Sequence, residues 1–215
     1  MSACRFGSSM VAAVLLSAPL AARAEEGGPV LQVGLRSGYA LPFGKMDADA
    51  SKDISDAVGG VIPVWAEAGV HYRSVFAGAF IQWGYGLTKN CPATISCSAS
   101  HVRAGLEALF HIDPDAGASP WLGAGFGYEW INLNASQGGS SASAQGRGFE
   151  FLSLHAGLDF KLTDRARVGP FVTLTLSQVG TESVSSGSQS SSADVKNTSI
   201  HEFLLFGMRL SFDAS

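Results

Sequence analysis

The sequence predicts an all-β protein, an eight-stranded antiparallel up-and-down transmembrane β-barrel with short periplasmic turns and four long extracellular loops. Three observations predict it. Apolar and polar residues alternate with period two in eight segments. The connections between these segments are alternately short and long, and charged residues avoid one of the two strand faces. Mean hydropathy is positive (+0.19), although after the first 24 residues the chain has no apolar run long enough for a membrane-spanning helix.

The first 24 residues are expected to form a cleaved secretory signal peptide, which leaves residues 25–215 as one barrel domain. Arg5 supplies a basic start, Met10–Ala22 is an apolar run too short to span a bilayer as a helix, and Ala22 and Ala24 are small residues suited to cleavage. Without Arg5 and Arg23, twelve of the fourteen basic residues remain against eighteen acidic ones, a net charge of −6. This balance, without a basic cluster, argues against nucleic acid as a partner.

Each strand is placed where the alternation begins and ends. The eight predicted strands are Val30–Tyr39, Ile62–Tyr72, Val75–Tyr85, His101–His111, Trp121–Trp130, Phe149–Leu162, Arg167–Ser177 and His201–Phe212. Helical periodicity fits none of them, and only the Asp-rich stretch Lys45–Val58 is expected to form a helical turn.

The connections are sorted by length. Arg73-Ser74 joins the second and third strands, Ile112–Pro120 the fourth and fifth, and Thr163–Ala166 the sixth and seventh. The other connections are long and polar, and two of them, Asn134–Gly148 and Gln178–Ser199, are Ser/Gly-rich and expected to be flexible loops without a rigid pocket. Short turns at one end and long loops at the other favour a membrane barrel over a Greek-key sandwich.

The two strand faces differ in charge. One carries residues such as Leu35, Ile81 and Leu106 and has no charge within the strands, with Glu150 and Glu202 predicted at its outer rim. This face is expected to meet lipid, where Arg or Lys at mid-membrane costs roughly 2–4 kcal/mol. Pro170 also falls on it, close to the start of its strand, and is expected at a bulge because it cannot donate a ladder hydrogen bond.

Aromatic residues fall at both ends of the predicted strands. Such girdles mark the two membrane interfaces of a barrel. The short-turn girdle is Tyr72, Phe110, Phe160 and Phe212, and the long-loop girdle is Tyr39, Trp83, Tyr85, Tyr128 and Trp130.

The opposite face is polar and is expected to line the lumen. An eight-stranded barrel has an interior that side chains can just fill, and charges there need partners. We therefore predict a side-chain-plugged lumen rather than a pore. The expected ion-pair network is Arg36, Glu67, Arg103, Glu107, Glu129, His155, Asp159, Lys161 and Arg209.

Cys91 and Cys97 are expected to form a disulfide in an oxidising, exported setting. No metal and no cofactor is expected. The stretch from Asp47 to Asp53 faintly resembles a calcium loop, but Lys52 stands where that loop has glycine and Val58 where it has glutamate.

The stretch Pro120-Trp-Leu-Gly-Ala-Gly-Phe-Gly-Tyr128 resembles the fifth strand of small barrels in the opacity-porin and OmpA/OmpX/OmpW-like superfamily. The last strand ends in the aromatic Phe212, which resembles the signal read by the barrel-assembly machinery, although Asp213-Ala214-Ser215 follows it. The resemblance implies a bacterial outer-membrane protein with a periplasmic N-terminus. Its expected partners are outer-membrane lipids, the assembly machinery during insertion and an unidentified surface ligand.

Three functions are compatible with the sequence. The leading one is a structural or surface-interaction barrel for membrane integrity, adhesion or environment contact through its long loops. The second is OmpW-like transport of small hydrophobic compounds, for which the apolar inward residues are Phe76, Phe80, Phe171, Phe203 and Leu205. The third, a lipid-modifying enzyme, is a minority reading that rests on Ser153 beside His155, with Asp159 or Glu107 to orient the ring and His201-Glu202 nearby. No catalytic residue is assigned.

Overall fold

The computed structural model describes residues 28–45, 53–186, 189–196 and 198–214. It contains nine strands and one short helix. They are β1 (Val30–Gly44), α1 (Ile54–Ala57), β2 (Val58–Tyr72), β3 (Val75–Thr88), β4 (Ser96–His111), β5 (Ala118–Gln137), β6 (Ser140–Lys161), β7 (Ala166–Ser186), β8 (Gln189–Asp194) and β9 (Ile200–Ala214).

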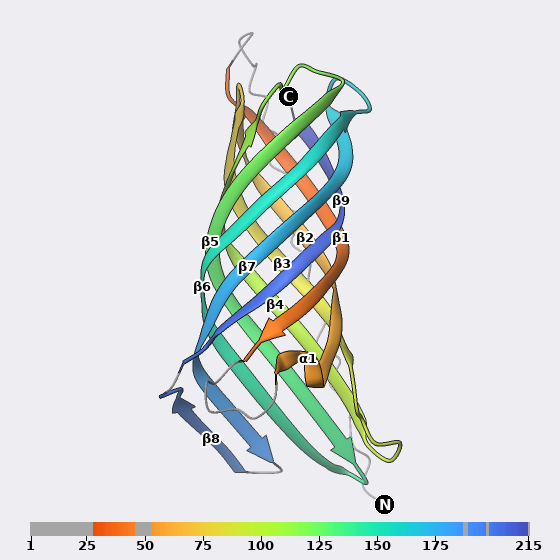
Figure 1. Ribbon diagram of the computed structural model, residues 1–215, viewed down its shortest axis with the longest axis vertical. Coiled ribbons are helices and arrows are strands. Elements are labelled where there is room, and N and C mark those ends of the chain that lie inside the picture. The colour runs from red at the N-terminus through yellow and green to blue at the C-terminus, as the bar shows by residue number, and fades with distance from the viewer. Residues whose placement is uncertain (1–27, 46–52, 187–188, 197, 215) are drawn as a thin grey trace, which may run out of the picture.

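Eight of the strands close into an antiparallel barrel, as predicted. Each of β1 to β6 pairs with the next in sequence, β6 pairs with β7, β7 with β9, and β9 closes the ring on β1. Strand β8 pairs only with the far half of β7 and stands outside the ring (Figure 1). Helix α1 confirms the expected helical turn within Lys45–Val58, and in the described part of the chain no helix has the length and apolarity to cross a bilayer.

Strands extend well beyond the predicted ends at one end of the barrel, called the long-loop end here; the end with the tight turns is the short-turn end. The ladder of β5 and β6 continues to Gln137 opposite Ser140, around Gly138 and Gly139 at φ +55° and +86°. Glycine adopts such positive φ angles in tight hairpin turns without steric cost. The segment Asn134–Gly148 is therefore a hairpin, and the flexible-loop prediction was wrong.

The second Ser/Gly-rich segment is also ordered as strands over most of its length. Strand β7 runs to Ser186. Strand β8 pairs with it antiparallel, from Thr181 opposite Asp194 to Ser186 opposite Gln189. Both hairpins lack apolar alternation on their outer side because that side meets water, so the strand signal in the sequence stops where the apolar belt stops. Figure 1 shows both hairpins projecting from the same end.

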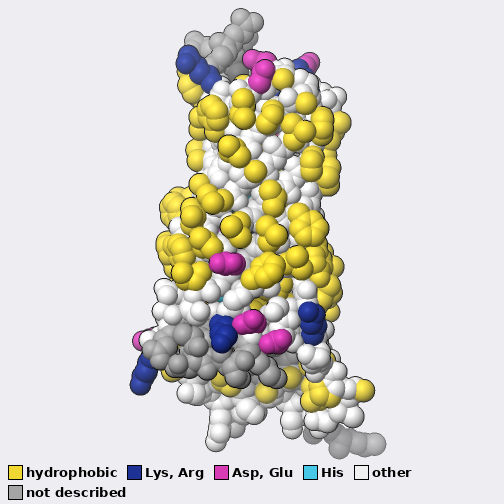
Figure 2. Space-filling model, in the orientation of Figure 1, with side chains coloured by type: hydrophobic (Ala, Val, Ile, Leu, Met, Phe, Trp, Pro, Cys, Tyr) yellow, Lys and Arg dark blue, Asp and Glu magenta, His cyan; other side chains and the backbone are white. Residues whose placement is uncertain are grey.

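The outside of the barrel is apolar around its middle. Leu35, Ile81 and Leu122 are 54–57% exposed, and Figure 2 shows hydrophobic side chains covering the middle of the visible face, with most charges toward the two ends. Seven of the nine residues assigned to the aromatic girdles are exposed, and Tyr39 and Trp130 are partly buried. Phe126 and Phe206 are exposed on the face predicted to be outward, whereas the exposed Phe43, Phe149 and Phe151 were not predicted there.

Strand β6 contains a β-bulge that changes which of its residues face the lumen. Its register against β5 and β7 shifts between Glu150 and Leu152, so one extra residue is accommodated in a bulge. Phe151 points outward and Glu150 is fully buried in the lumen. The prediction that Glu150 lies at the rim of the lipid face was wrong, because it carried one parity through the whole strand.

The predicted bulge at Pro170 is absent. Pro170 is paired opposite Met208, and the register of β6 against β7 is unbroken from Gly157–Phe171 to Phe160–Val168. The proline sits close to the start of β7, where losing one donor is tolerated.

Candidate functional site

A network of ion pairs fills the middle of the lumen. Arg36 contacts the carboxylate of Glu67 and donates from Nη2 to Oε2 of Glu107 at 3.0 Å. Arg209 donates from Nη1 to Oδ2 of Asp159 and from Nη2 to Oε1 of Glu67, each at 2.6 Å. These side chains are all buried, so each cation is held by two carboxylates out of contact with bulk water.

A second ion pair joins β4 to the bulge of β6. Arg103 donates from Nη2 to Oε1 of Glu150 at 2.5 Å and from Nε to Oε2, and its Nη1 donates to Oε1 of Gln82 at 2.9 Å. A fork of this kind is the strongest geometry available to a guanidinium and a carboxylate. Because β5 lies between β4 and β6 in the sheet, the pair reaches over the inner face of β5.

Two histidines contact a fifth carboxylate toward the long-loop end. His101 Nε2 lies 3.1 Å from Oε2 of Glu129, and His201 Nε2 contacts the other oxygen of the same carboxylate. The ring of His101 stacks on Phe203 with centroids 4.5 Å apart. The sequence reading assigned Glu129 to the network but left out both histidines, although their inward parity in β4 and β9 was readable.

Lys161 does not join the lumen network, contrary to the prediction. Its ammonium lies 2.9 Å from Oδ1 of Asp164 in the turn after β6, and its side chain is 37% exposed. The ammonium of Lys161 lowers the pKa of Asp164 from its ordinary value. At the end of a strand a long lysine side chain reaches water more cheaply than it enters the lumen.

With its histidines counted as neutral, the lumen therefore holds more carboxylates than cations instead of equal numbers. The prediction set four cations against four carboxylates, whereas the structure removes Lys161 and adds Glu150. Three buried arginines face five buried carboxylates, with four buried histidines among them. The carboxylates are Glu67, Glu107, Glu129, Glu150 and Asp159, and the histidines are His101, His111, His155 and His201.

Aromatic rings alternate with the three guanidinium groups. Trp121 lies against Arg209 and Arg36, with distances of 5.2 and 5.5 Å from each guanidinium carbon to the ring centroid. Trp65 lies against Arg36 and Arg103 at 4.5 and 5.0 Å. These cation–π contacts form one continuous series, Arg209–Trp121–Arg36–Trp65–Arg103. Both tryptophans are almost wholly buried and fill the space that would otherwise hold water.

The sequence reading missed both tryptophans as lumen residues. Their signal was their parity, since Trp65 lies between the outward Val64 and Ala66. Gly157 makes room for the ring of Trp121, because a Cβ at Gly157 would fall against the six-membered part of that ring. The inward phenylalanines and Leu205, named as an apolar path for transport, are buried in the same packing.

An apolar layer closes the lumen at the long-loop end. Ile54 of α1 and Val58 pack with Val61, Ala99 and Ile131 in one buried cluster. Helix α1 contributes Ile54 to this cluster and contacts β1 and β2. Ion pairs, rings and this layer together fill the lumen.

Beyond the apolar layer, toward the tips of the extended hairpins, lies a solvent-open hollow of about 290 Å³, called the vestibule. Its walls come from α1, the end of β3 and the extensions of β4, β5, β6 and β7. Its wall residues include Ala57, Lys89, Leu133, Ala142, Ala144 and Val184.

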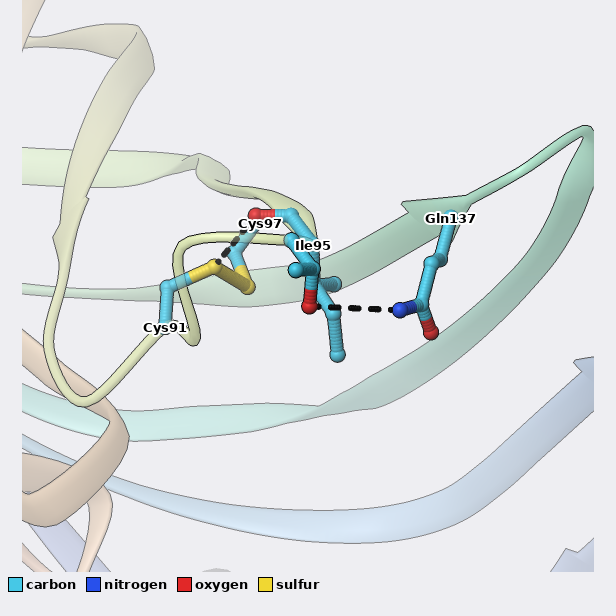
Figure 3. Close-up of a disulfide and its surroundings, with 5 residues drawn as sticks. Cys91, Ile95, Cys97 and Gln137 are labelled. Atoms are coloured by element: carbon cyan, nitrogen blue, oxygen red, sulfur yellow. Dashed lines mark hydrogen bonds between the residues drawn. A yellow bond between two sulfur atoms is a disulfide. The ribbon is translucent and has the colours of Figure 1, made fainter.

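A disulfide between Cys91 and Cys97, expected from the sequence, lies at the edge of this vestibule. Figure 3 shows it bridging the connection between β3 and β4, beside the tip of β5. Gln137 of β5 donates to Oγ1 of Thr94 within the bridged segment at 3.2 Å. The disulfide and this bond fix the connection against the neighbouring hairpin.

The residues considered for lipid chemistry are part of the packed lumen. His155 Nδ1 lies 2.9 Å from Oγ1 of Thr173, and its Nε2 lies 3.7 Å from Oε2 of Glu107. Ser153 is buried beside them, and in the described residues no hydrogen bond links it to His155. Over the same residues no group of three His, Cys, Asp or Glu side chains is placed to hold a metal, and residues 47–52 of the calcium-like stretch lie outside the description.

Comparison with known proteins finds a common fold and no closer relationship. No protein-family model matches the sequence, and no curated protein matches it. A major outer membrane protein from Thermus thermophilus has a similar structure with a TM-score of 0.61 at 9% identity, covering 87% of this chain and all of that one. Neisserial surface protein A matches with a TM-score of 0.54 at 12% identity, covering 87% and 99% of the two chains. The chain thus has the fold of small eight-stranded outer-membrane barrels.

Proposed function

We propose that this protein is an outer-membrane barrel that spans the bilayer with its lumen closed to solutes and acts at the cell surface through its long-loop end. The observation that carries the proposal is the filled lumen: buried ion pairs and tryptophan rings beneath the apolar layer around Ile54 and Val58. A protein with no path along its axis works through its surfaces. Stabilising the membrane, adhesion and contact with the environment are all roles of this kind.

The outer belt supports the membrane placement. Large apolar side chains half exposed to solvent would be costly in water and are favourable against lipid. The proposal places the short-turn end, with the barrel's first and last strand ends, in the periplasm and the two Ser/Gly-rich hairpins outside. Lipids of the outer membrane surround the belt, and the barrel-assembly machinery inserts the chain through its last strand.

Electrical recordings test the closed lumen. The purified protein in a planar bilayer should give no large steady conductance at neutral pH. A stable, ion-selective open channel would overturn the closed-lumen proposal.

Cysteine labelling on intact cells tests the orientation. Ser141 lies beside the tip of the β5–β6 hairpin, and Asp164 lies in the turn between β6 and β7. A membrane-impermeant maleimide should label Ser141→Cys and not Asp164→Cys, whereas lysed cells should show both labelled. Labelling of Asp164→Cys alone on intact cells would reverse the orientation.

A further inference from the structure

We propose that the vestibule at the long-loop end binds a small amphipathic carboxylate, with the apolar body inside and the carboxylate at Lys89. This site goes beyond the closed-barrel function and does not depend on a path through the lumen. The cavity holds about 290 Å³, at the lower end of the range of roughly 300–1,000 Å³ for small-molecule sites.

The inner and outer faces of the extended hairpins differ in polarity. Outside, Ser143 and Ser185 hydroxyls lie 2.6 Å apart and Gln145 donates to Asn132 at 2.7 Å, so that face is a hydrogen-bonded polar ladder. The inner face carries Leu133, Ala142, Ala144 and Val184 instead. Hairpins that only projected into water would have no use for an apolar inner face, whereas a cavity for an apolar ligand requires one.

The vestibule has a floor. Leu133 packs on the buried cluster that contains Ile131, and that cluster closes the barrel beneath it. A smaller hollow of about 120 Å³ shares Leu133, Ala144 and Val184 with the vestibule and extends it along the wall. The two hollows together offer an apolar wall along β5, β6 and β7, which suits a short alkyl chain.

The charged side chains that line the two hollows determine where the carboxylate of the ligand lies. Lys89 is the cation that lines the vestibule, and its ammonium donates to the backbone oxygen of Ser55 on α1 at 3.3 Å. Among the described residues no carboxylate lies within 4.0 Å of it. Glu182 lines the smaller hollow and repels a carboxylate from that end. The carboxylate therefore sits at Lys89 and the alkyl chain points toward Val184.

Binding of decanoate and of the uncharged, length-matched decanol tests the site. The full chain is placed in lipid nanodiscs, and titration calorimetry is corrected with empty discs for partition into lipid. Ala144→Phe fills the vestibule, and Ser136→Phe places the same ring on the exposed outer face of the β5–β6 hairpin as a control. Both variants are first checked for folding by their heat-modifiable mobility on gels.

Decanoate should bind wild-type protein and Ser136→Phe equally and Ala144→Phe at least tenfold more weakly. Lys89→Gln should weaken decanoate about threefold to fivefold, as expected for a solvent-exposed charge, and leave decanol unchanged. Equal binding to Ala144→Phe and wild type overturns the vestibule as the site. Equal weakening of both ligands by Lys89→Gln overturns the carboxylate class. Neither result bears on the conductance and labelling tests of the closed barrel.

Discussion

Arg103 of β4 and Glu150 of β6 pair over the intervening strand β5, with Nε and Nη2 of the guanidinium each directed at one oxygen of the carboxylate. The other two lumen arginines each contact two carboxylates, whereas Glu150 is the carboxylate that Arg103 contacts among the described residues. The acidic excess of the lumen is therefore unevenly distributed. Arg36 shares its carboxylates, and Arg103 depends on one.

Neutralising Glu150 should cost much more than neutralising Glu107. Glu150→Gln leaves the buried guanidinium of Arg103 without an anion, a change that typically costs about 3–5 kcal/mol. Glu107→Gln leaves Arg36 paired with Glu67 and removes one carboxylate from an acidic lumen, so its cost should stay below about 1 kcal/mol. Urea unfolding of both variants in lipid vesicles measures the difference.

The double variant Arg103→Met with Glu150→Leu provides the control. Replacing both partners by apolar groups removes the unpaired charge and should recover most of the stability lost in Glu150→Gln. Equal costs for Glu150→Gln and Glu107→Gln would show that Arg103 does not depend on Glu150.

The barrel itself was predictable because the membrane requires a simple alternation of apolar and polar residues along each strand. Lipid outside and a packed lumen inside force strict alternation, and Leu35, Ile81 and Leu122 are outward as that alternation required. The alternation fails where the chain departs from period two. The bulge beside Glu150 adds one residue, and no local feature of Phe149-Glu-Phe-Leu152 announces it. Only the cross-strand register reveals that Glu150 faces Arg103.

The site was less predictable than the fold. Ser/Gly-rich sequence is compatible with both a disordered loop and a strand whose outer face is wet, so the hairpins beyond Asn134 and Gln178 carried no decisive signal. The vestibule depends on these hairpins. Its apolar residues, such as Leu133 and Ala144, are too small and too few to form a pattern until the register places them on one face.

Trp65 is expected to stabilise the packing of the lumen. Its ring separates the guanidinium groups of Arg36 and Arg103, so Trp65→Ala leaves a polar-walled gap that water can enter. Loss of a buried tryptophan typically costs about 3–5 kcal/mol, and urea unfolding in lipid vesicles measures this loss. Planar bilayers should stay non-conducting, because the apolar layer around Ile54 and Val58 is unchanged.

The matched control for that change is Trp83→Ala. Trp83 is 53% exposed on the outer belt, and its loss changes no lumen contact. It should lose less stability than Trp65→Ala. Equal losses in the two variants would mean that Trp65 contributes no more to stability inside the lumen than Trp83 does on the belt.

Breaking the disulfide should loosen one corner of the vestibule and leave the barrel intact. Cys91 and Cys97 bridge six positions of sequence at the long-loop end, away from the belt. The double variant Cys91→Ser with Cys97→Ser should be cut faster by protease between Lys89 and Ser96, because the segment keeps only weaker restraints such as the Gln137–Thr94 bond. Urea unfolding of the barrel should shift by less than about 1 kcal/mol, since the lumen and belt are unchanged. A collapse of barrel stability would contradict this.

Lys161→Gln tests the placement of Lys161 at the short-turn end. The ammonium of Lys161 lowers the pKa of Asp164, so removing it should raise the Asp164 pKa toward its ordinary value in a carboxyl-detected NMR titration. A carboxyl with a lowered folded-state pKa stabilises the fold above its unfolded-state pKa, and that stabilisation disappears as the pH falls through the folded-state value. Because Asp164 is fully exposed and the pair is screened by water, this contribution is small, and unfolding at neutral pH should be unchanged in the variant. Strong destabilisation at neutral pH, with the Asp164 titration unmoved, would instead return Lys161 to the lumen network.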